Sequence, residues 1–419
     1  MPEEKRWLPL FASPKGEVME LPGLTMLARS GSQWVVPESR EMIPLPKGAA
    51  LVSIPGRIPV GWDGTRPRPI DMSTAGRPAQ AVAALLPQGF TRTLLPACVS
   101  SGLSTPLPLY GYSAVGFRGG RIWVAAIQTD QHRKWHPRHY NTESLPGRIS
   151  RMLAKFPENR LVRQLANCSL QYSCYTAQNI FYQRWEGGLP TMASCNADCL
   201  GCISQNHLGV DSPQQRLNFR PSITEITELG LEHLTQAREG IISFGQGCEG
   251  EPSLNAPDLA AAIHNIRQHT DRGTININTN AGYTEGIIKL CRAGLDSMRV
   301  TLFSPREENY ALYHRPCNYK LEDVITSICY AHQAGVKVSI NLLTMPGFTD
   351  REEEIESLLS FVRKYGVDMV QLRNLNIDAD LLFGSVGSGG ETAGIGALVD
   401  VLREELPAVV IGSYTHPVR

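Results

Sequence analysis

From about residue 190 to residue 375, short apolar runs alternate with segments of helical periodicity. In the helical segments apolar residues recur three or four positions apart, and Ser222 with Glu225 forms a capping-box pattern at the start of one of them. Gly240 stands where that helix is expected to end. The apolar runs are typical of buried strands. The pattern predicts strands at 191–194, 241–244, 274–280, 298–303, 336–343 and 368–372.

Six strand–helix repeats with short connections imply parallel strands and right-handed crossovers. A full eight-fold barrel would need more chain. We therefore expect an α/β protein built on a partial (β/α)6 barrel of the TIM type, with a doubly wound open sheet as the alternative. In both arrangements the functional groups belong to the loops at the carboxyl ends of the strands.

The pattern divides the rest of the chain into further regions. Residues 1–147 are rich in proline and glycine and show short strand-like runs, which predict a β-rich domain with a hairpin at Gly119-Gly120. Residues 148–189 have the pattern of a helical connector, and the barrel is assigned to 190–380. Residues 381–419 are expected to form a glycine-rich loop, a helix from about Ile395 to Glu405 and a strand. The sequence indicates no role for residues 1–147.

Charge and composition exclude several classes of function. The 40 basic and 40 acidic residues cancel, so nothing indicates the basic surface that binds nucleic acid. The amino terminus has no apolar export signal, and no apolar stretch approaches the roughly 20 residues that span a bilayer. We therefore expect a cytoplasmic protein without a membrane partner. Ten cysteines in 419 residues are too few for a disulfide scaffold, so clustered cysteines are candidate metal ligands.

Cys195, Cys199 and Cys202 fall within eight residues, directly after the first predicted strand. A Cys-x3-Cys-x2-Cys loop suits one corner of a cubane iron–sulfur cluster, with each thiolate on a different iron, whereas tetrahedral zinc normally takes four ligands. Three thiolates leave one iron of a 4Fe–4S cluster open to a substrate. The alternatives are a zinc site completed by a distant histidine such as His207, and three structural thiols.

This loop resembles that of the radical S-adenosylmethionine (radical SAM) superfamily, where it follows the first strand of a partial barrel. The resemblance covers roughly residues 190–375 and implies that Cys195, Cys199 and Cys202 ligate a 4Fe–4S cluster. It also implies that the open iron chelates S-adenosyl-L-methionine (SAM). One electron from the reduced cluster then cleaves SAM to methionine and a 5′-deoxyadenosyl radical, and that radical takes a hydrogen atom from a substrate.

A second stretch, Gly250-Glu251-Pro252, resembles the Gly-Gly-Glu-Pro segment of the superfamily, whose backbone and acid hold the methionine ammonium group. Glycine lets the main chain approach a ligand closely, and a carboxylate accepts hydrogen bonds from an ammonium group. The match is imperfect, because Glu249 stands in place of the second glycine and Cys248 is an added cysteine. The resemblance makes Gly250 and Glu251 candidate SAM-binding residues, and a plain turn is the alternative.

Polar residues at the ends of later strands extend this candidate set. Asn280 follows a strand with asparagines on one face and resembles the Thr-Asn-Gly turn of the superfamily. Ser304 and Asn341 occupy positions where the superfamily often places groups for the nucleoside. Capping of strand ends is the alternative for these residues.

Cys168 and Cys174 lie upstream of the main loop, six residues apart. One interpretation joins them to Cys98 or Cys248 around an auxiliary cluster, and the other makes them core residues, because free cysteine is often buried. The sequence leaves both open.

The leading hypothesis is a radical SAM enzyme with two cofactors, a 4Fe–4S cluster and SAM, that is supplied with electrons by a low-potential donor of the flavodoxin or ferredoxin type. An iron–sulfur electron-transfer or redox-sensing protein, with another fourth ligand, is the alternative. A zinc-stabilised binding domain is a third interpretation. The sequence identifies neither the substrate nor the overall reaction.

Overall fold

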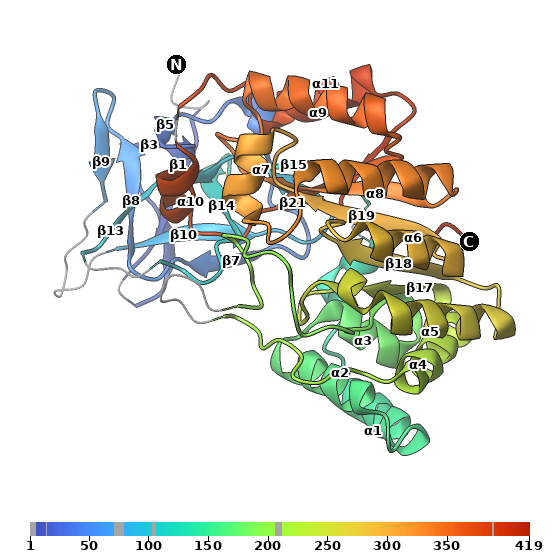
Figure 1. Cartoon of the computed structure of the whole chain (residues 1–419). Coiled ribbons are helices and arrows are strands. Elements are labelled where there is room, and N and C mark those ends of the chain that lie inside the picture. Colours follow the sequence, from blue (N-terminus) through green and yellow to red (C-terminus); the bar gives the residue numbers. More distant parts are fainter. Residues whose placement is uncertain are drawn as a thin grey trace. The chain divides into compact units, whose positions relative to one another are not determined.

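A computed structural model describes residues 6–13, 15–70, 79–102, 106–131, 133–205, 212–387 and 389–419 (Figure 1). His207 lies outside these residues. The chain forms two compact units. The first contains Met1–His132, Thr344–Glu356 and Leu372–Glu405, and the second contains Arg133–Leu343, Ser357–Gln371 and Leu406–Arg419.

Antiparallel strands dominate the first unit. Its main sheet has the strand order β11-β15-β14-β1-β10-β7, with β2 paired to β1 and β6 paired to β15. These strands are β1 (Leu8–Ala12), β2 (Val18–Glu20), β6 (Met42–Pro44), β7 (Ala50–Ser53), β10 (Gln80–Leu85), β11 (Phe90–Arg92), β14 (Tyr112–Arg118) and β15 (Arg121–Gln128). The hairpin predicted at Gly119-Gly120 is confirmed, since it joins β14 to β15 and both glycines have positive φ.

Two smaller sheets complete the β structure of this unit. One has the order β12-β4-β5, and the other has the order β13-β8-β3 with β9 paired to β8. Their strands are β3 (Thr25–Met26), β4 (Ala28–Ser30), β5 (Gln33–Val35), β8 (Arg57–Trp62), β9 (Pro67–Pro69), β12 (Leu95–Pro96) and β13 (Cys98–Ser100).

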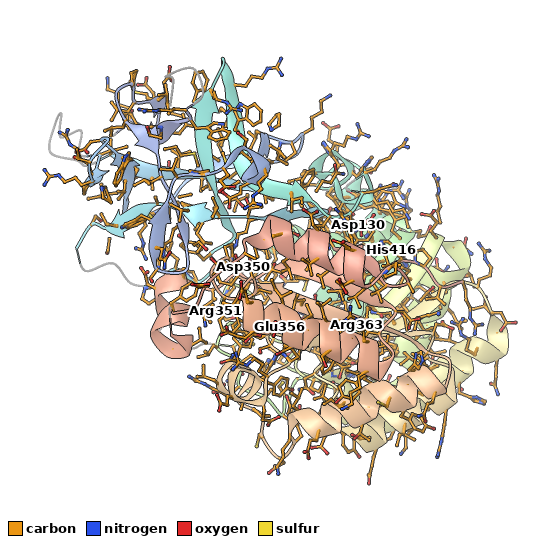
Figure 2. All side chains as sticks on the ribbon, turned by 90° about the horizontal axis from the view of Figure 1, so that it is seen from above. Asp130, Asp350, Arg351, Glu356, Arg363 and His416 are labelled. Carbon is orange, nitrogen blue, oxygen red and sulfur yellow. The ribbon has the colours of Figure 1, made fainter. Side chains whose placement is uncertain are left out.

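The first unit also contains α10 (Ala379–Val386) and α11 (Ile395–Glu405), and α11 confirms the helix predicted at 395–405. Figure 2 shows Asp350 and Arg351 just before α9 (Glu352–Tyr365). The Asp350 carboxylate accepts a hydrogen bond from the Gly347 N–H at 2.7 Å, and the Arg351 guanidinium donates to the Gly387 carbonyl at 2.8 Å. These bonds fix the segment that precedes α9.

A parallel half-barrel of seven strands forms the second unit, in the unbroken order β16-β17-β18-β19-β20-β21-β22. The strands are β16 (Arg184–Gly188), β17 (Arg238–Phe244), β18 (Thr274–Thr279), β19 (Ser297–Leu302), β20 (Lys337–Thr344), β21 (Met369–Asn374) and β22 (Val410–Gly412). A doubly wound sheet reverses its strand order at a switch point, and this sheet does not. The partial barrel is thus confirmed, with seven strands in the sheet.

The predicted first strand at 191–194 is wrong. The strand that begins the sheet is β16, and residues 191–194 are an irregular segment after it. The Thr191 and Met192 N–H groups donate to the Glu249 carboxylate instead of to a neighbouring strand. Glycine normally weakens a strand, so the presence of Gly187 and Gly188 argued against a strand at the position of β16. Here they admit close packing, since a Cβ at Gly187 would lie 2.3 Å from Ile180.

Helices precede the sheet and follow its strands. They are α1 (Leu145–Lys155), α2 (Arg160–Gln171), α3 (Tyr175–Tyr182), α4 (Ile223–Gln236), α5 (Ala256–His269), α6 (Thr284–Ala293), α7 (Glu307–His314) and α8 (Leu321–Gln333). The capping box of Ser222 and Glu225 opens α4, as predicted. Helices α4, α5, α6 and α8 pack side by side along the sheet (Figure 1). Among the described residues no helix is long and apolar enough to cross a membrane.

Candidate functional site

The cysteine loop follows β16 and lies against the end of α7. The Leu200 N–H donates to the Tyr313 carbonyl at 3.0 Å, and the Asp198 N–H donates to the His314 carbonyl at 3.2 Å. The Cys317 N–H donates back to the Asn196 carbonyl at 2.8 Å. Backbone hydrogen bonds therefore hold the loop along residues 313–317.

All three thiols of the loop are partly buried. Burial, with the nearby Glu251 carboxylate, raises the pKa of Cys195 to about 11, and burial raises that of Cys199 further. Because metals bind thiolates, binding at this loop must release protons. Among the described residues no three metal-ligating side chains group around a single ion. A cubane cluster places its thiolate ligands on different irons, so they need not meet at one point.

Two nitrogen donors reach the thiols from other parts of the chain. His314 Nδ1 lies 3.4 Å from Cys199 Sγ, and Arg216 Nη2 lies 3.8 Å from Cys202 Sγ. The Phe303 N–H donates to His314 Nε2 at 3.1 Å, which assigns the ring proton to Nδ1. Burial lowers the pKa of His314 to about 3, so the ring is neutral and donates to Cys199. No motif in the sequence indicated His314 or Arg216, since both meet the loop only in the folded chain.

Gly250 is packed directly against the segment that leads into the cysteine loop. Its N–H donates to the Met192 carbonyl at 2.6 Å, and the Glu251 N–H donates to the Ser194 carbonyl at 2.8 Å. A Cβ at Gly250 would lie 2.0 Å from the Ser194 oxygen. Only glycine permits this approach.

The Glu251 carboxylate is buried and hydrogen-bonded within the protein. It accepts bonds from the Ser253 N–H at 2.9 Å, from the Thr279 hydroxyl at 2.5 Å and from the Asn280 N–H at 2.8 Å. Burial raises its pKa, and these three donors oppose the rise. Glu251 therefore ties the turn after β17 to the end of β18.

Glu249, which the sequence presented as a departure from the family pattern, holds the same region together. One carboxylate oxygen accepts the N–H groups of Thr191 and Met192, at 2.8 and 3.2 Å, and the Thr191 hydroxyl. The other accepts the N–H groups of Gly245 and Gln246, at 2.5 and 3.1 Å. Burial raises the pKa of Glu249 to about 7 against these donors. The acid bridges the segment before the cysteines to the turn after β17.

Asn280 also contacts the cysteine loop, because its side-chain amide donates to Asn196 Oδ1 at 2.7 Å. Ser304 is buried after β19 and accepts the Arg306 N–H at 3.1 Å. Asn341 on β20 donates to the Thr301 hydroxyl at 3.3 Å, and its Oδ1 is buried without a hydrogen-bond partner in the part of the chain that the structure describes. An orphaned buried acceptor of this kind suits a ligand donor.

The asparagines on β18 are used inside the barrel. Asn276 bonds the hydroxyls of Ser243 and Ser297, at 3.0 and 2.9 Å, and Asn278 donates to the Phe244 carbonyl at 2.9 Å. The polar face that stood out in the sequence is therefore largely satisfied by neighbouring strands.

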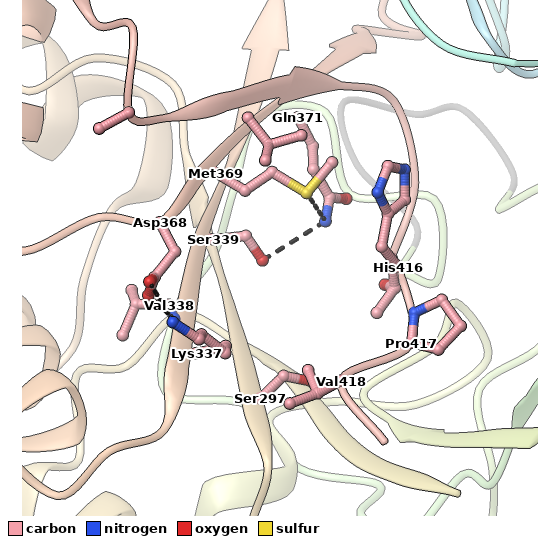
Figure 3. A pocket seen from close by; sticks show the side chains of 13 residues that line it. Ser297, Lys337, Val338, Ser339, Asp368, Met369, Gln371, His416, Pro417 and Val418 are labelled. Carbon is pink, nitrogen blue, oxygen red and sulfur yellow. Dashed lines mark hydrogen bonds and ion pairs between the residues drawn. The ribbon is translucent and has the colours of Figure 1, made fainter.

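A cavity of about 400 Å³ lies at the amino-terminal ends of the strands, away from the cysteine loop (Figure 3). Lys337 and Asp368 form an ion pair of 2.9 Å at its edge, and Gln371 bonds Ser339 across its wall. The tail after β22 crosses this end, since the Val418 N–H donates to the Thr274 hydroxyl at 2.8 Å. Because chemistry in barrels of this kind is placed at the carboxyl ends, we assign the candidate active site to the cysteine loop.

Of the upstream cysteines, Cys168 lies beside Cys248, with 3.7 Å between the sulfur atoms. The Cys174 thiol lies 3.3 Å from the Thr176 hydroxyl. An auxiliary cluster at Cys168 and Cys174 stays a prediction.

The residues around the cysteine loop fit a 4Fe–4S cluster with bound SAM. Three thiols on one loop could serve as cluster ligands, and two N–H donors face their sulfurs. The buried Asn341 Oδ1, without a hydrogen-bond partner among the described residues, could accept a bond from SAM. The glycine turn approaches the loop as closely as a backbone can.

Residues 189–361 match the family model of the radical SAM superfamily. A comparison with curated proteins finds no match. Solved structures with similarity include a radical SAM methyltransferase from Sphaerobacter thermophilus, at 18% identity and a TM-score of 0.38, over 55% of this chain and 65% of that chain. Methylornithine synthase matches at 14% identity and a TM-score of 0.39, over 64% and 75%.

The hydrogenase maturase HydG from Carboxydothermus hydrogenoformans matches at 17% identity and a TM-score of 0.37, over 64% of this chain and 68% of that chain. Such low values carry no argument about the reaction. The match to the family model does not depend on these structures. The cofactors of the radical SAM family are a 4Fe–4S cluster and SAM. Residues 189–361 therefore form a radical SAM domain.

Proposed function

We propose that this chain is an enzyme that cleaves SAM reductively and uses the resulting radical to take hydrogen from a substrate. The observation that carries the proposal is the direct packing of the Gly250 turn onto the segment before Cys195, with 2.6 Å between Gly250 N and the Met192 oxygen. The contact supports the proposal because it joins the turn that we assign to SAM to the segment that leads into the loop that we assign to the cluster.

In this proposal Cys195, Cys199 and Cys202 hold the cluster through deprotonated thiols. The bound cluster and SAM together supply one-electron cleavage of the sulfonium and a primary carbon radical. Gly250 and Glu251 shape the turn that receives the methionine end of SAM. The Glu251 carboxylate keeps its three internal bonds and positions the backbone of this turn.

Asn280, Ser304 and Asn341 extend the site along the neighbouring strands. Asn341 Oδ1 accepts a hydrogen bond from the nucleoside, which removes the cost of a buried acceptor without a partner. Asn280 maintains the loop through Asn196. Ser304, buried beyond β19, lines the same end of the barrel.

The reaction needs a low-potential reductant, and we propose a flavodoxin or ferredoxin as its source. The overall reaction, and whether SAM is consumed or regenerated, follow from the identity of the substrate.

The test is anaerobic reconstitution with iron and sulfide, reduction with dithionite, and chromatography for 5′-deoxyadenosine after addition of SAM. We expect 5′-deoxyadenosine from a chain carrying about four irons. Replacing Cys195, Cys199 or Cys202 with alanine should abolish it. Cys317→Ala is the matched control, because this exposed cysteine contributes only its backbone N–H to the loop.

A chain that binds the cluster but never forms 5′-deoxyadenosine would favour the electron-transfer or redox-sensing alternative. Tight binding of zinc in place of iron would contradict both iron-based functions. Full cleavage activity in all three cysteine variants would overturn the ligand assignment.

A further inference from the structure

Two buried thiols face each other outside the cluster loop. Cys168 on α2 and Cys248 in the turn after β17 are 80 positions apart in sequence, yet their sulfur atoms are 3.7 Å apart. Their exposed fractions are 1% and 6%. The two sulfurs are therefore in van der Waals contact and screened from bulk solvent.

The surroundings make the two sulfurs unequal. The Gln164 side-chain amide donates to Cys168 Sγ at 3.5 Å, and the Cys168 and Cys248 thiols are in hydrogen-bond contact at 3.7 Å. The contact with Cys248 and the Gln164 amide lower the pKa of Cys168 against its burial. Because the amide can stabilise a thiolate at Cys168, we take Cys168 as the thiol that reacts first.

We propose that Cys168 and Cys248 are a site of reversible oxidation, at which hydrogen peroxide converts the two thiols to a disulfide. The Cys168 thiolate attacks peroxide and breaks its O–O bond, which gives a sulfenic acid and, after proton uptake, water. The Cys248 sulfur then attacks Cys168 Sγ, and the sulfenic oxygen leaves as a second water with the Cys248 proton. Two thiols and one peroxide become one disulfide and two waters. A dithiol reductant reverses the change.

Burial selects the oxidant. A thiol with 1% exposure is reached more readily by a molecule close to water in size than by a bulky disulfide. Peroxide is also a natural hazard for a protein that holds an oxidation-sensitive cluster.

Closing the bond would tie the turn that carries Cys248 to α2. A disulfide has an S–S length of about 2.05 Å, so the sulfurs must approach by roughly 1.7 Å from their present 3.7 Å. Cys248 is followed directly by Glu249, which holds the Thr191 and Met192 N–H groups, and by Gly250, which contacts Met192. Oxidation at Cys168 and Cys248 therefore constrains the turn that contacts the segment before the cysteine loop.

The first experiment exposes the reconstituted full chain to limiting hydrogen peroxide, alkylates the remaining thiols and maps peptides by mass spectrometry without reductant. We expect one linked pair joining the Cys168 and Cys248 peptides, lost after dithiothreitol. Cys174→Ser should retain the link, and Cys168→Ser should lack it. The linked chain should also unfold at a higher temperature, because the bond closes an 80-residue loop.

The proposal would be overturned by a disulfide between Cys168 and Cys174. It would also be overturned if Cys168 and Cys248 stayed reduced at a peroxide concentration that modifies Cys317. Peptide mapping of the wild-type chain decides this even if a variant fails to fold. A second arm rests on the proposed function: after removal of peroxide and renewed cluster loading, the linked chain should form 5′-deoxyadenosine at least several-fold more slowly, with recovery after dithiothreitol. An unchanged rate in the linked chain would overturn the coupling alone.

Discussion

The two ends of the parallel sheet are built on different principles. At the carboxyl end, main-chain groups meet main-chain groups, as where a Cβ at Gly250 would lie 2.0 Å from the Ser194 oxygen. At the amino end, side chains border a cavity of about 400 Å³, with the half-exposed Lys337 paired to Asp368. An added side-chain atom would clash at the carboxyl end, whereas the cavity at the amino end can accept one. Mutational sensitivity should therefore differ sharply between two ends of the same strands.

The largest effect should come from Gly250→Ala. The added methyl would overlap a backbone oxygen, so we expect a loss of more than about 3 kcal/mol in the free energy of unfolding, together with loss of cluster iron. Chemical denaturation and iron analysis measure both. Gly147→Ala, on α1, is the control, because a Cβ there meets nothing within 4 Å. If the two variants were equally stable, the close packing at Gly250 would not make the carboxyl end sensitive to substitution.

Glu249 should give the carboxyl end a distinctive pH dependence. Its pKa is raised from the ordinary 4.5 to about 7, so between these values the folded chain binds a proton that the unfolded chain releases. The stability of the wild-type chain relative to Glu249→Gln should therefore fall by up to about 3 kcal/mol from pH 4.5 to 7 and then level off. Urea denaturation of both chains across this range measures it. A difference that rises with pH would show that the donors around Glu249 outweigh its burial.

His314→Phe should act on the cluster more than on the fold. The change removes the hydrogen bond to Cys199 Sγ, which stabilises the more negative reduced cluster. A bond worth about 1 kcal/mol more in the reduced state corresponds to roughly 40 mV, so the midpoint potential should become more negative by that order. A potentiometric titration followed by electron paramagnetic resonance measures it. His264→Phe, on the exposed side of α5, should leave the potential unchanged.

Lys337→Met at the amino end should have the smallest effect. Its ion pair with Asp368 is largely exposed, and such pairs contribute about 0–1 kcal/mol. We expect a change in the free energy of unfolding below about 1 kcal/mol and an unchanged rate of 5′-deoxyadenosine formation. A marked loss of that activity would mean that the cavity end takes part in the chemistry.

Periodicity predicted most of the second unit, because each strand from β17 to β21 is a local apolar run with helices around it. It misplaced the first strand, since β16 ends in two glycines and owes its place to packing against Ile180. Such packing depends on residues that meet only in the folded chain.

The cysteine loop stood out in the sequence because its three thiols are neighbours along the chain, and their role as cluster ligands stays a prediction. Glu249 could not be interpreted in the same way, because its partners at 191 and 192 lie more than fifty residues upstream. His314 lies 115 positions after Cys199 and Arg216 lies 14 positions after Cys202, so no local motif links them to the thiols. A local motif can therefore be read from the sequence as a set of candidate ligands. The hydrogen bonds around those ligands come from distant residues and can be read only from the fold.

The bonds that hold the cysteine loop to residues 313–317 join main-chain groups. None of them uses a thiol of Cys195, Cys199 or Cys202. The backbone therefore sets where the loop lies, and the side chains of the same residues are left for binding.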